Sequence, residues 1–134
     1  MRAAAAAALA IVATALAAGC GQQSPDLFEV VRTGPAPRLD LVVNDDGTAR
    51  CNGKEHALPG ELLLRARQAS RDLADQADLG LHLPPGHGTV FSYRVRVQQG
   101  EVSFADTSPR QPKAFVETQA LTKDIAEQVC GLHT

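Results

Sequence analysis

The residues with the most reactive side chains in this chain of 134 residues are three cysteines and four histidines. Cys20 follows an uncharged, alanine-rich segment, whereas Cys51 and Cys130 lie far apart in the rest of the chain. A thiol can be acylated, form a disulfide, bind a metal or act as a nucleophile. Which of these is expected depends on the cellular compartment of the protein. The segment before Cys20 therefore has to be interpreted first.

Residues 1–19 have the features of a secretory signal peptide. Arg2 supplies a positive start, residues 3–18 are uncharged and mostly alanine, and small residues precede Cys20. A membrane-spanning helix is the alternative, but it needs roughly 20 apolar residues, and this segment is shorter and only weakly apolar. The sequence "LAAGC" resembles the bacterial lipobox, in which small residues precede a cysteine that is acylated and becomes the mature N-terminus. Ala17 occupies the position where leucine is commonest in that motif.

The lipobox resemblance implies an exported lipoprotein, anchored to the bacterial cell membrane or envelope by acyl chains such as palmitate on Cys20. Each buried methylene of such a chain contributes roughly 0.8 kcal/mol, so two or three chains hold a protein firmly. Ordinary cleavage beside Cys20 is the alternative, and it would leave a soluble protein with a free thiol. We predict a signal peptide over 1–19, a lipidated cysteine and short tether over 20–25, and one domain over 26–134.

Lipidation of Cys20 would leave Cys51 and Cys130 as a pair in an oxidising compartment. We predict that these two residues form a disulfide. It would close a loop of about 80 residues and stabilise the domain by roughly 4 to 5 kcal/mol on the chain-entropy estimate. Two separate buried thiols are the alternative.

The remaining reactive residues predict neither a metal site nor catalysis. His82 and His87 lie in a proline-rich loop without acidic neighbours in sequence, whereas zinc ligands are usually more closely spaced. Cys51 could act as a nucleophile beside His56 only as a free thiol. The sequence Asp106-Thr107-Ser108 is typical of turns and helix caps. We predict no catalytic residue, no metal and no cofactor, and we keep an enzyme or metal protein as a third possibility.

Charge gives one candidate surface. The formal net charge is −2, and it becomes −3 when Arg2 is removed with the leader, so nucleic acid is not a predicted partner. Arg94 and Arg96 share one face of an expected strand, next to Ser103 and Glu101 on its neighbour. This face could dock a partner; a plain solvated face is the alternative.

The pattern of apolar residues predicts the elements that position these side chains. Alternation predicts strands over 28–32, 38–44 and 48–52 and a hairpin over 89–106, and three- and four-residue spacing predicts helices within 58–80 and after residue 112. The predicted fold class is therefore α+β: an antiparallel sheet of about five strands in the order β-β-β-α-β-β-α, with helices on one face.

Turn residues predict the pairing of the strands. Asp46-Gly47 as a two-residue turn would pair Val42 with Cys51. Gln99-Gly100 as a turn would pair Val97 with Val102 and place the apolar residues of that hairpin on one face. The last helix should cover this face with an apolar stripe: Phe115, Thr118, Thr122, Ile125, Ala126 and Val129.

Four short phrases resemble the emfourin family, small bacterial inhibitors of thermolysin-type metalloproteases. They are "RTG" (Arg32–Gly34), "LPPG" (Leu83–Gly86), "VFSYRV" (Val90–Val95) and "DTSP" (Asp106–Pro109), within a resemblance that spans about Phe28 to Val129. The lipidated leader, the "DDGTARC" hairpin and the cysteine pair depart from that family. The chain also resembles lipoproteins of unknown function from GC-rich bacteria.

Two functions follow as expectations. The first is a non-enzymatic exported lipoprotein that contacts the membrane through its lipid and binds a protein partner or serves as an envelope module. The second, implied by the emfourin resemblance, is an inhibitor of an exported thermolysin-type protease.

Overall fold

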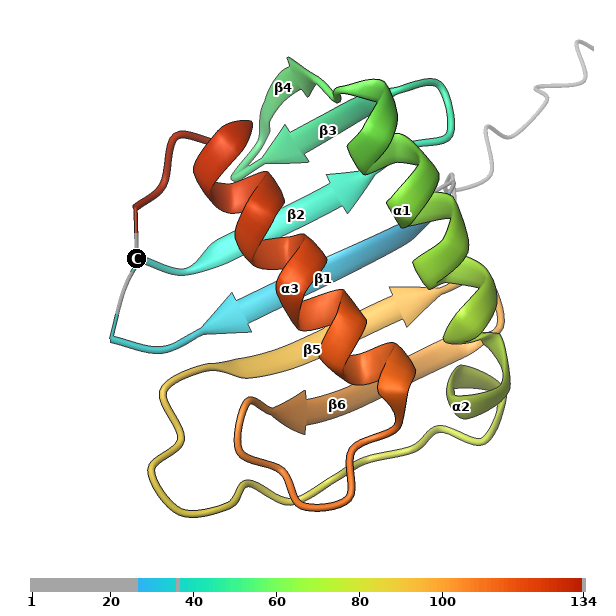
Figure 1. The fold of residues 1–134 in the computed structure, drawn as a ribbon, viewed down its shortest axis with the longest axis vertical. Coiled ribbons are helices and arrows are strands. Elements are labelled where there is room, and N and C mark those ends of the chain that lie inside the picture. Colours follow the sequence, from blue (N-terminus) through green and yellow to red (C-terminus); the bar gives the residue numbers. More distant parts are fainter. Residues whose placement is uncertain (1–26, 36, 134) are drawn as a thin grey trace, which may run out of the picture.

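Six antiparallel strands and three helices are formed by residues 27–35 and 37–133, the part of the chain that this computed structural model describes (Figure 1). The strands are β1 (Phe28–Thr33), β2 (Leu39–Val43), β3 (Thr48–Cys51), β4 (Lys54–Ala57), β5 (Ser92–Val97) and β6 (Gly100–Ala105). The helices are α1 (Gly60–Asp72), α2 (Ala74–Asp78) and α3 (Lys113–Gln128). The strand order is β4-β3-β2-β1-β5-β6. None of the described helices is long and apolar enough to cross a membrane.

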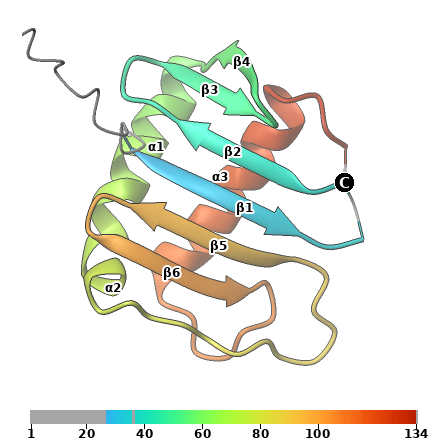
Figure 2. The ribbon, with the colours of Figure 1, turned by 180° about the vertical axis from the view of Figure 1, so that it is seen from behind.

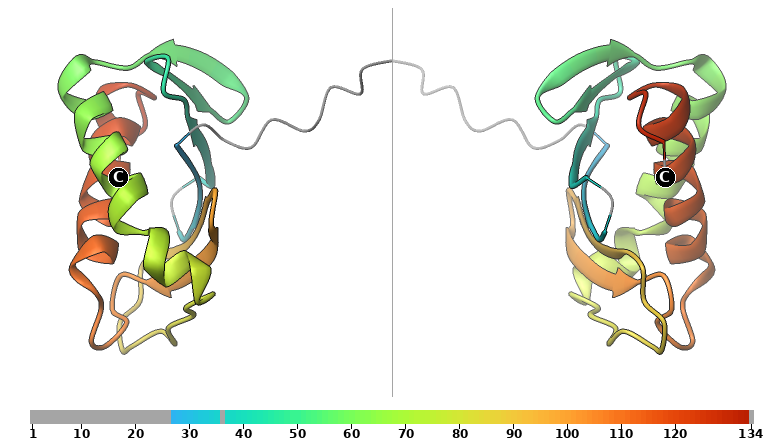
Figure 3. Two further views of the ribbon diagram at one scale, coloured as in Figure 1. Left: turned by 90° about the vertical axis from the view of Figure 1, so that its right-hand side faces the viewer. Right: turned by 90° about the vertical axis from the view of Figure 1, so that its left-hand side faces the viewer.

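The two faces of the sheet differ because buried and exposed residues alternate along the strands. In β5, Tyr93, Val95 and Val97 are buried, whereas Ser92 and Arg94 are exposed. The helices lie against the inner face only, and the opposite face is left open (Figures 2 and 3). The predicted α+β class with helices on one face is therefore confirmed.

The core lies between this inner face and α1 and α3. Phe104 stacks between Tyr93 and Phe115, with ring centroids 5.2 and 4.4 Å apart. The predicted stripe of α3 is buried here, apart from its last member, Val129, which is half-buried. The two threonines in the stripe are accommodated because each hydroxyl donates to the carbonyl four residues earlier in the helix.

The Cys51–Cys130 disulfide predicted from the sequence is present, with an S–S distance of 2.04 Å. It joins the end of β3 to the chain just beyond α3 and so fixes the C-terminal end of that helix to the sheet. Cys20 and the expected leader lie outside the described residues.

The sheet has one strand more than predicted, and the predicted helix over 58–80 is two helices. Strand β4 consists of Lys-Glu-His-Ala, whose charged and exposed side chains gave no strand signal. Such residues are typical of an edge strand, which must resist pairing with other chains.

The predicted single helix is divided at one residue. Helix α1 ends at Asp72 and α2 begins at Ala74, with Leu73 fully buried between them. Gly80, with φ +60°, ends the segment as expected.

Both predicted hairpin registers were wrong because the turns differ from those assumed. The β2–β3 loop has three residues, 45–47, so Leu41 rather than Val42 faces Cys51. In the β5–β6 hairpin Val97 pairs with Gly100, not Val102, and the turn is Gln98-Gln99. The second register moved by two residues, which is the side-chain period of a strand, so its apolar residues still share one face.

Candidate functional site

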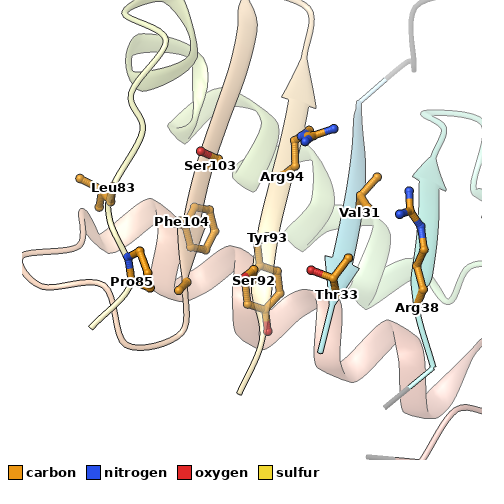
Figure 4. Close-up of a pocket in the computed structure, with 11 residues that line it drawn as sticks. Val31, Thr33, Arg38, Leu83, Pro85, Ser92, Tyr93, Arg94, Ser103 and Phe104 are labelled. Atoms are coloured by element: carbon orange, nitrogen blue, oxygen red, sulfur yellow. The ribbon is translucent and has the colours of Figure 1, made fainter. Parts of the chain in front are cut away.

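The open face of the sheet carries a groove of about 270 Å³ where β1 ends and β5 begins (Figure 4). This is slightly below the range of about 300–1,000 Å³ that is typical of small-molecule sites. It is lined by Val31, Thr33, Arg38, Leu83, Pro85, Ser92, Tyr93, Arg94, Ser103, Phe104 and Ala105. The groove thus combines three neighbouring strands with the loop that precedes β5.

Strand register explains why Arg94 lies in this groove. It is flanked by Val31 of β1 and Ser103 of β6, and Arg96 lies between Glu29 and Glu101 in the next row. The structure therefore places both predicted docking arginines on the open face, next to the neighbours expected from the sequence. Arg38, which precedes β2, completes the cationic part of the groove, and sequence analysis did not select it.

The ion pairs of these arginines leave part of each guanidinium group free. Arg38 Nε donates to Asp40 Oδ1 at 3.1 Å, and Arg94 Nε lies 3.6 Å from Glu101 Oε1. Neither arginine uses its terminal Nη groups in a hydrogen bond to a described residue, and both side chains are more than 60% exposed. Arg96 differs, because its Nη2 is paired with Glu29.

A histidine and a serine meet at the rim of the groove. His82 Nδ1 lies 2.6 Å from Ser103 Oγ, a pairing that can activate a nucleophile when a third group orients the base. Backbone hydrogen bonds from Ser103 to Leu81 and from Leu83 to Ser103 bring the two residues together. No carboxylate among residues 27–35 and 37–133 bonds to His82, so the third group of a catalytic triad is missing there.

The other histidines are not gathered into a site. No three His, Cys, Asp or Glu side chains in the described part of the chain are placed to hold a metal ion. His87 is exposed in the loop before β5, and His56 lies in edge strand β4.

The four segments that carry the emfourin resemblance contact one another at the end of the sheet where the groove lies, where β1 ends and β5 begins. The Arg32 guanidinium carbon lies 4.6 Å from the centre of the Phe91 ring. A Cβ at Gly34 would come within 2.5 Å of the Val90 carbonyl oxygen, so only glycine fits there without a shift. The phrase ending β1 is therefore packed against the phrase that begins β5.

The phrase after β6 holds the loop before β5 in place. Asp106 accepts hydrogen bonds from the backbone N–H groups of Val90 and Phe91, each at 3.2 Å. Thr107 Oγ1 accepts one from Gly86 at 3.1 Å, and a Cβ at Gly86 would lie 2.2 Å from the Thr107 carbonyl oxygen. We call residues 32–34, 83–91 and 105–109 the loop cluster.

The turn predicted at Asp106-Thr107-Ser108 is confirmed, but the helix cap is not. Ser108 Oγ accepts a hydrogen bond from the Ala105 N–H at 2.8 Å and closes the turn after β6. Helix α3 begins several residues later at Lys113, and Pro112 precedes it without a side-chain cap. The polar side chains of this segment therefore serve tertiary contacts rather than the helix.

The loop cluster contains a buried charge, that of Arg32, which the sequence analysis did not identify as buried. Arg32 is 2% exposed and its Nε has no hydrogen-bond partner in the described structure. Burial raises the pKa of the neighbouring Tyr93, an effect that the Arg32 charge opposes and the Asp106 charge reinforces. The signal was available in the alternation of β1, which puts Arg32 on the same face as Phe28 and Val30.

Comparison with protein-family models, with curated proteins and with solved structures gives no match for this chain. The function must therefore be argued from its own surfaces. The two that stand out are the groove on the open face and the loop cluster beside it.

Proposed function

We propose that this protein is an exported lipoprotein, anchored through Cys20, whose domain binds a partner protein without catalysing a reaction. The observation that carries the proposal is the one-sided sheet: helices cover one face, and the other presents a groove lined by two arginines with free Nη groups. Arginine is enriched at the hot spots of protein interfaces, and complementary charges across an interface contribute specificity.

The position of the groove suits an anchored protein. The chain enters the sheet at Phe28, and the groove lies at the opposite end of β1, near Thr33. A strand of six residues extends about 20 Å, so a domain tethered before β1 can present the groove away from its point of attachment. The disulfide supports export, because disulfides persist in oxidising compartments and are rare in the cytosol.

Anchoring is tested by replacing the acylated residue. The wild-type chain should be recovered with membranes and carry the mass of acyl chains on Cys20, whereas Cys20→Ala should be released into the soluble exported fraction. Cys51 and Cys130 provide the internal control, because both should resist thiol reagents in the unreduced protein. A wild-type chain without acyl mass would refute the anchor.

Partner binding is tested by photo-crosslinking in cells. A photoreactive residue at Thr33, exposed in the groove, should give a discrete adduct with one envelope protein. The matched control is Leu64 on α1, which is 64% exposed on the helical side of the molecule. Equal adducts at both positions, or none at Thr33, would contradict binding through the open face.

Inhibition of a thermolysin-type metalloprotease is the second candidate, and the loop cluster favours it. Residues 87–90 are exposed, while hydrogen bonds to Asp106 and Thr107 hold the loop in one conformation. A preorganised exposed loop loses little entropy when it binds, which is an advantage for an inhibitor. The resemblance itself is a weaker argument, because the residues that carry it contact one another and are required by the fold.

This candidate is tested against a thermolysin-type protease with a peptide substrate. Nanomolar protein should slow hydrolysis, and Thr107→Val, which removes the hydroxyl that holds Gly86 and Thr89, should weaken inhibition about tenfold. No slowing at a tenfold excess of protein over protease would reject the inhibitor function and leave the first proposal intact.

A further inference from the structure

We infer that the groove recognises an acidic, extended segment of a protein, with a carboxylate held between Arg38 and Arg94. This inference rests on the proposed binding function and names the chemistry of the partner. The lining of the groove contains these two arginines and no carboxylate, and the carboxylates that pair with them, on Asp40 and Glu101, lie outside the lining.

The geometry of the two ion pairs leaves room for such a ligand. Asp40 and Glu101 each approach the Nε of their arginine, and this orients the guanidinium groups without occupying the Nη groups. In Figure 4 the two guanidinium groups lie on opposite sides of Val31. The register places Arg94 on one side of Val31 and Asp40, the partner of Arg38, on the other. A carboxylate that reaches the Nη groups of both arginines accepts charge-assisted hydrogen bonds, which are about twice as strong as neutral ones.

Binding does not require either existing ion pair to break. Both pairs are exposed, and exposed ion pairs contribute little to stability, so a small shift of either arginine toward a ligand costs little. The charges of Asp40 and Glu101 do oppose an incoming carboxylate. Affinity must therefore come from hydrogen bonds to the Nη groups and from contacts along the rest of the groove.

The rest of the lining favours a peptide over a free anion. Besides the arginines, the groove exposes hydroxyl groups on Thr33 and Ser92, which can bond to a peptide backbone, whereas the Ser103 hydroxyl already pairs with His82. Leu83 and Pro85 form an apolar wall on the far side. An inorganic anion would leave these hydroxyls and this wall without contacts, whereas an extended segment with an acidic and an apolar residue would use both.

The test is selection of peptides from a random, phage-displayed seven-residue library on the purified full chain in detergent. The selected peptides should be enriched in Asp or Glu at one position and in an apolar residue at another. Replacing the acidic residue by its amide in a synthetic peptide should weaken binding about tenfold or more, measured by fluorescence anisotropy.

Two variants of the chain connect this selectivity to the groove. The double variant Arg38→Gln, Arg94→Gln should lose binding of the acidic peptide about tenfold or more and bind its amide form as weakly as the wild type does. The matched control is Arg50→Gln, an exposed arginine on the same open face that does not line the groove. Circular dichroism checks that all three chains are folded.

The inference is overturned if selection gives no acidic enrichment, or if the double variant binds the selected peptides as the wild type does. Its failure is distinguishable from failure of the proposed function. If the photo-crosslinked adduct at Thr33 forms equally in the double variant, the domain binds a partner on its open face but does not select a carboxylate there.

Discussion

Removal of the Cys51–Cys130 disulfide should cost more stability than any other small change in the domain. The perturbation is the double variant Cys51→Ala, Cys130→Ala. The bridge spans a sequence separation of 79 residues. For a loop of this length, the chain-entropy estimate of the lost stabilisation is about 4.5 kcal/mol at 25 °C. Typical domains have unfolding free energies of about 5–15 kcal/mol, so the variant should be close to unfolding at 37 °C.

The position of the bridge adds to this effect. Cys51 is buried in β3, and Cys130 follows α3, so the bridge links the sheet directly to the C-terminal end of the helix that covers it. Without the bridge, this end of α3 is held by the packing of residues such as Ile125 and Ala126. Amides in the last turn of α3 should therefore exchange with deuterium faster than those around Phe115.

Urea unfolding monitored by far-ultraviolet circular dichroism is the appropriate assay, because the chain has no tryptophan and only one tyrosine. With a typical urea dependence of about 1–3 kcal/mol per molar, the transition midpoint should fall by roughly 2 M. Wild type reduced before unfolding is the control that retains both sulfur atoms, and it should behave like the double variant. A loss below about 1 kcal/mol, or two reactive thiols in unreduced wild type, would refute the reasoning.

Three further changes test the loop cluster and the buried polar groups. Gly86→Ala should lower the unfolding free energy by about 1–3 kcal/mol, because the added Cβ would meet the Thr107 carbonyl oxygen at 2.2 Å. The control is Gly60→Ala, which has no neighbour within 4 Å of the added Cβ and should be neutral or slightly stabilising. Equal effects of the two substitutions in thermal melts would contradict this. Tyr93→Phe should reduce the loss of stability above about pH 10. The raised pKa of Tyr93 means that the folded protein holds the phenolic proton more tightly than the unfolded chain does, and this stabilisation is lost as the pH rises. Urea titrations should show it, and parallel pH profiles of wild type and variant would be the contrary result. Arg32→Met should leave the unfolding free energy unchanged or raise it by up to about 2 kcal/mol. The substitution removes a buried N–H group that has no partner, and it also removes the contact of the guanidinium group with Phe91. A loss above about 2 kcal/mol would show that the guanidinium group is strongly stabilising.

The layered architecture could be predicted from the sequence because a strand or helix that is buried on one side has apolar residues at a regular spacing. In β5, alternation from Ser92 to Val97 identified the inner face and placed Arg94 and Arg96 on the outer one. The spacing of apolar residues in α3 identified its buried stripe in the same way. The disulfide was predictable from counting, since only two cysteines remain once Cys20 is assigned to lipidation.

The details that were mispredicted depend on interactions that produce no regular spacing of apolar residues in the sequence. Turn length is one of them: the Asp46 carboxylate accepts hydrogen bonds from the backbone and hydroxyl of Thr48, which stabilises three loop residues rather than two. Strand β4 is another, because its side chains are selected for exposure at an edge and not for strand formation. Arg38 is the most important omission, since its place in the same groove as Arg94 depends on β1 lying between β2 and β5.

The supports of the core and the proposed recognition surface lie in separate parts of this fold. The disulfide holds the sheet to the C-terminal end of α3, whereas the aromatic stack through Phe104 supports the groove from the N-terminal end of that helix, at Phe115. A helix of 16 residues is about 24 Å long, so the two supports are well separated. The arginines of the groove lie on the opposite face of the sheet and contribute little to the core. Substitutions around Arg38 and Arg94 should therefore alter the proposed binding surface while the disulfide and the aromatic stack keep the domain folded.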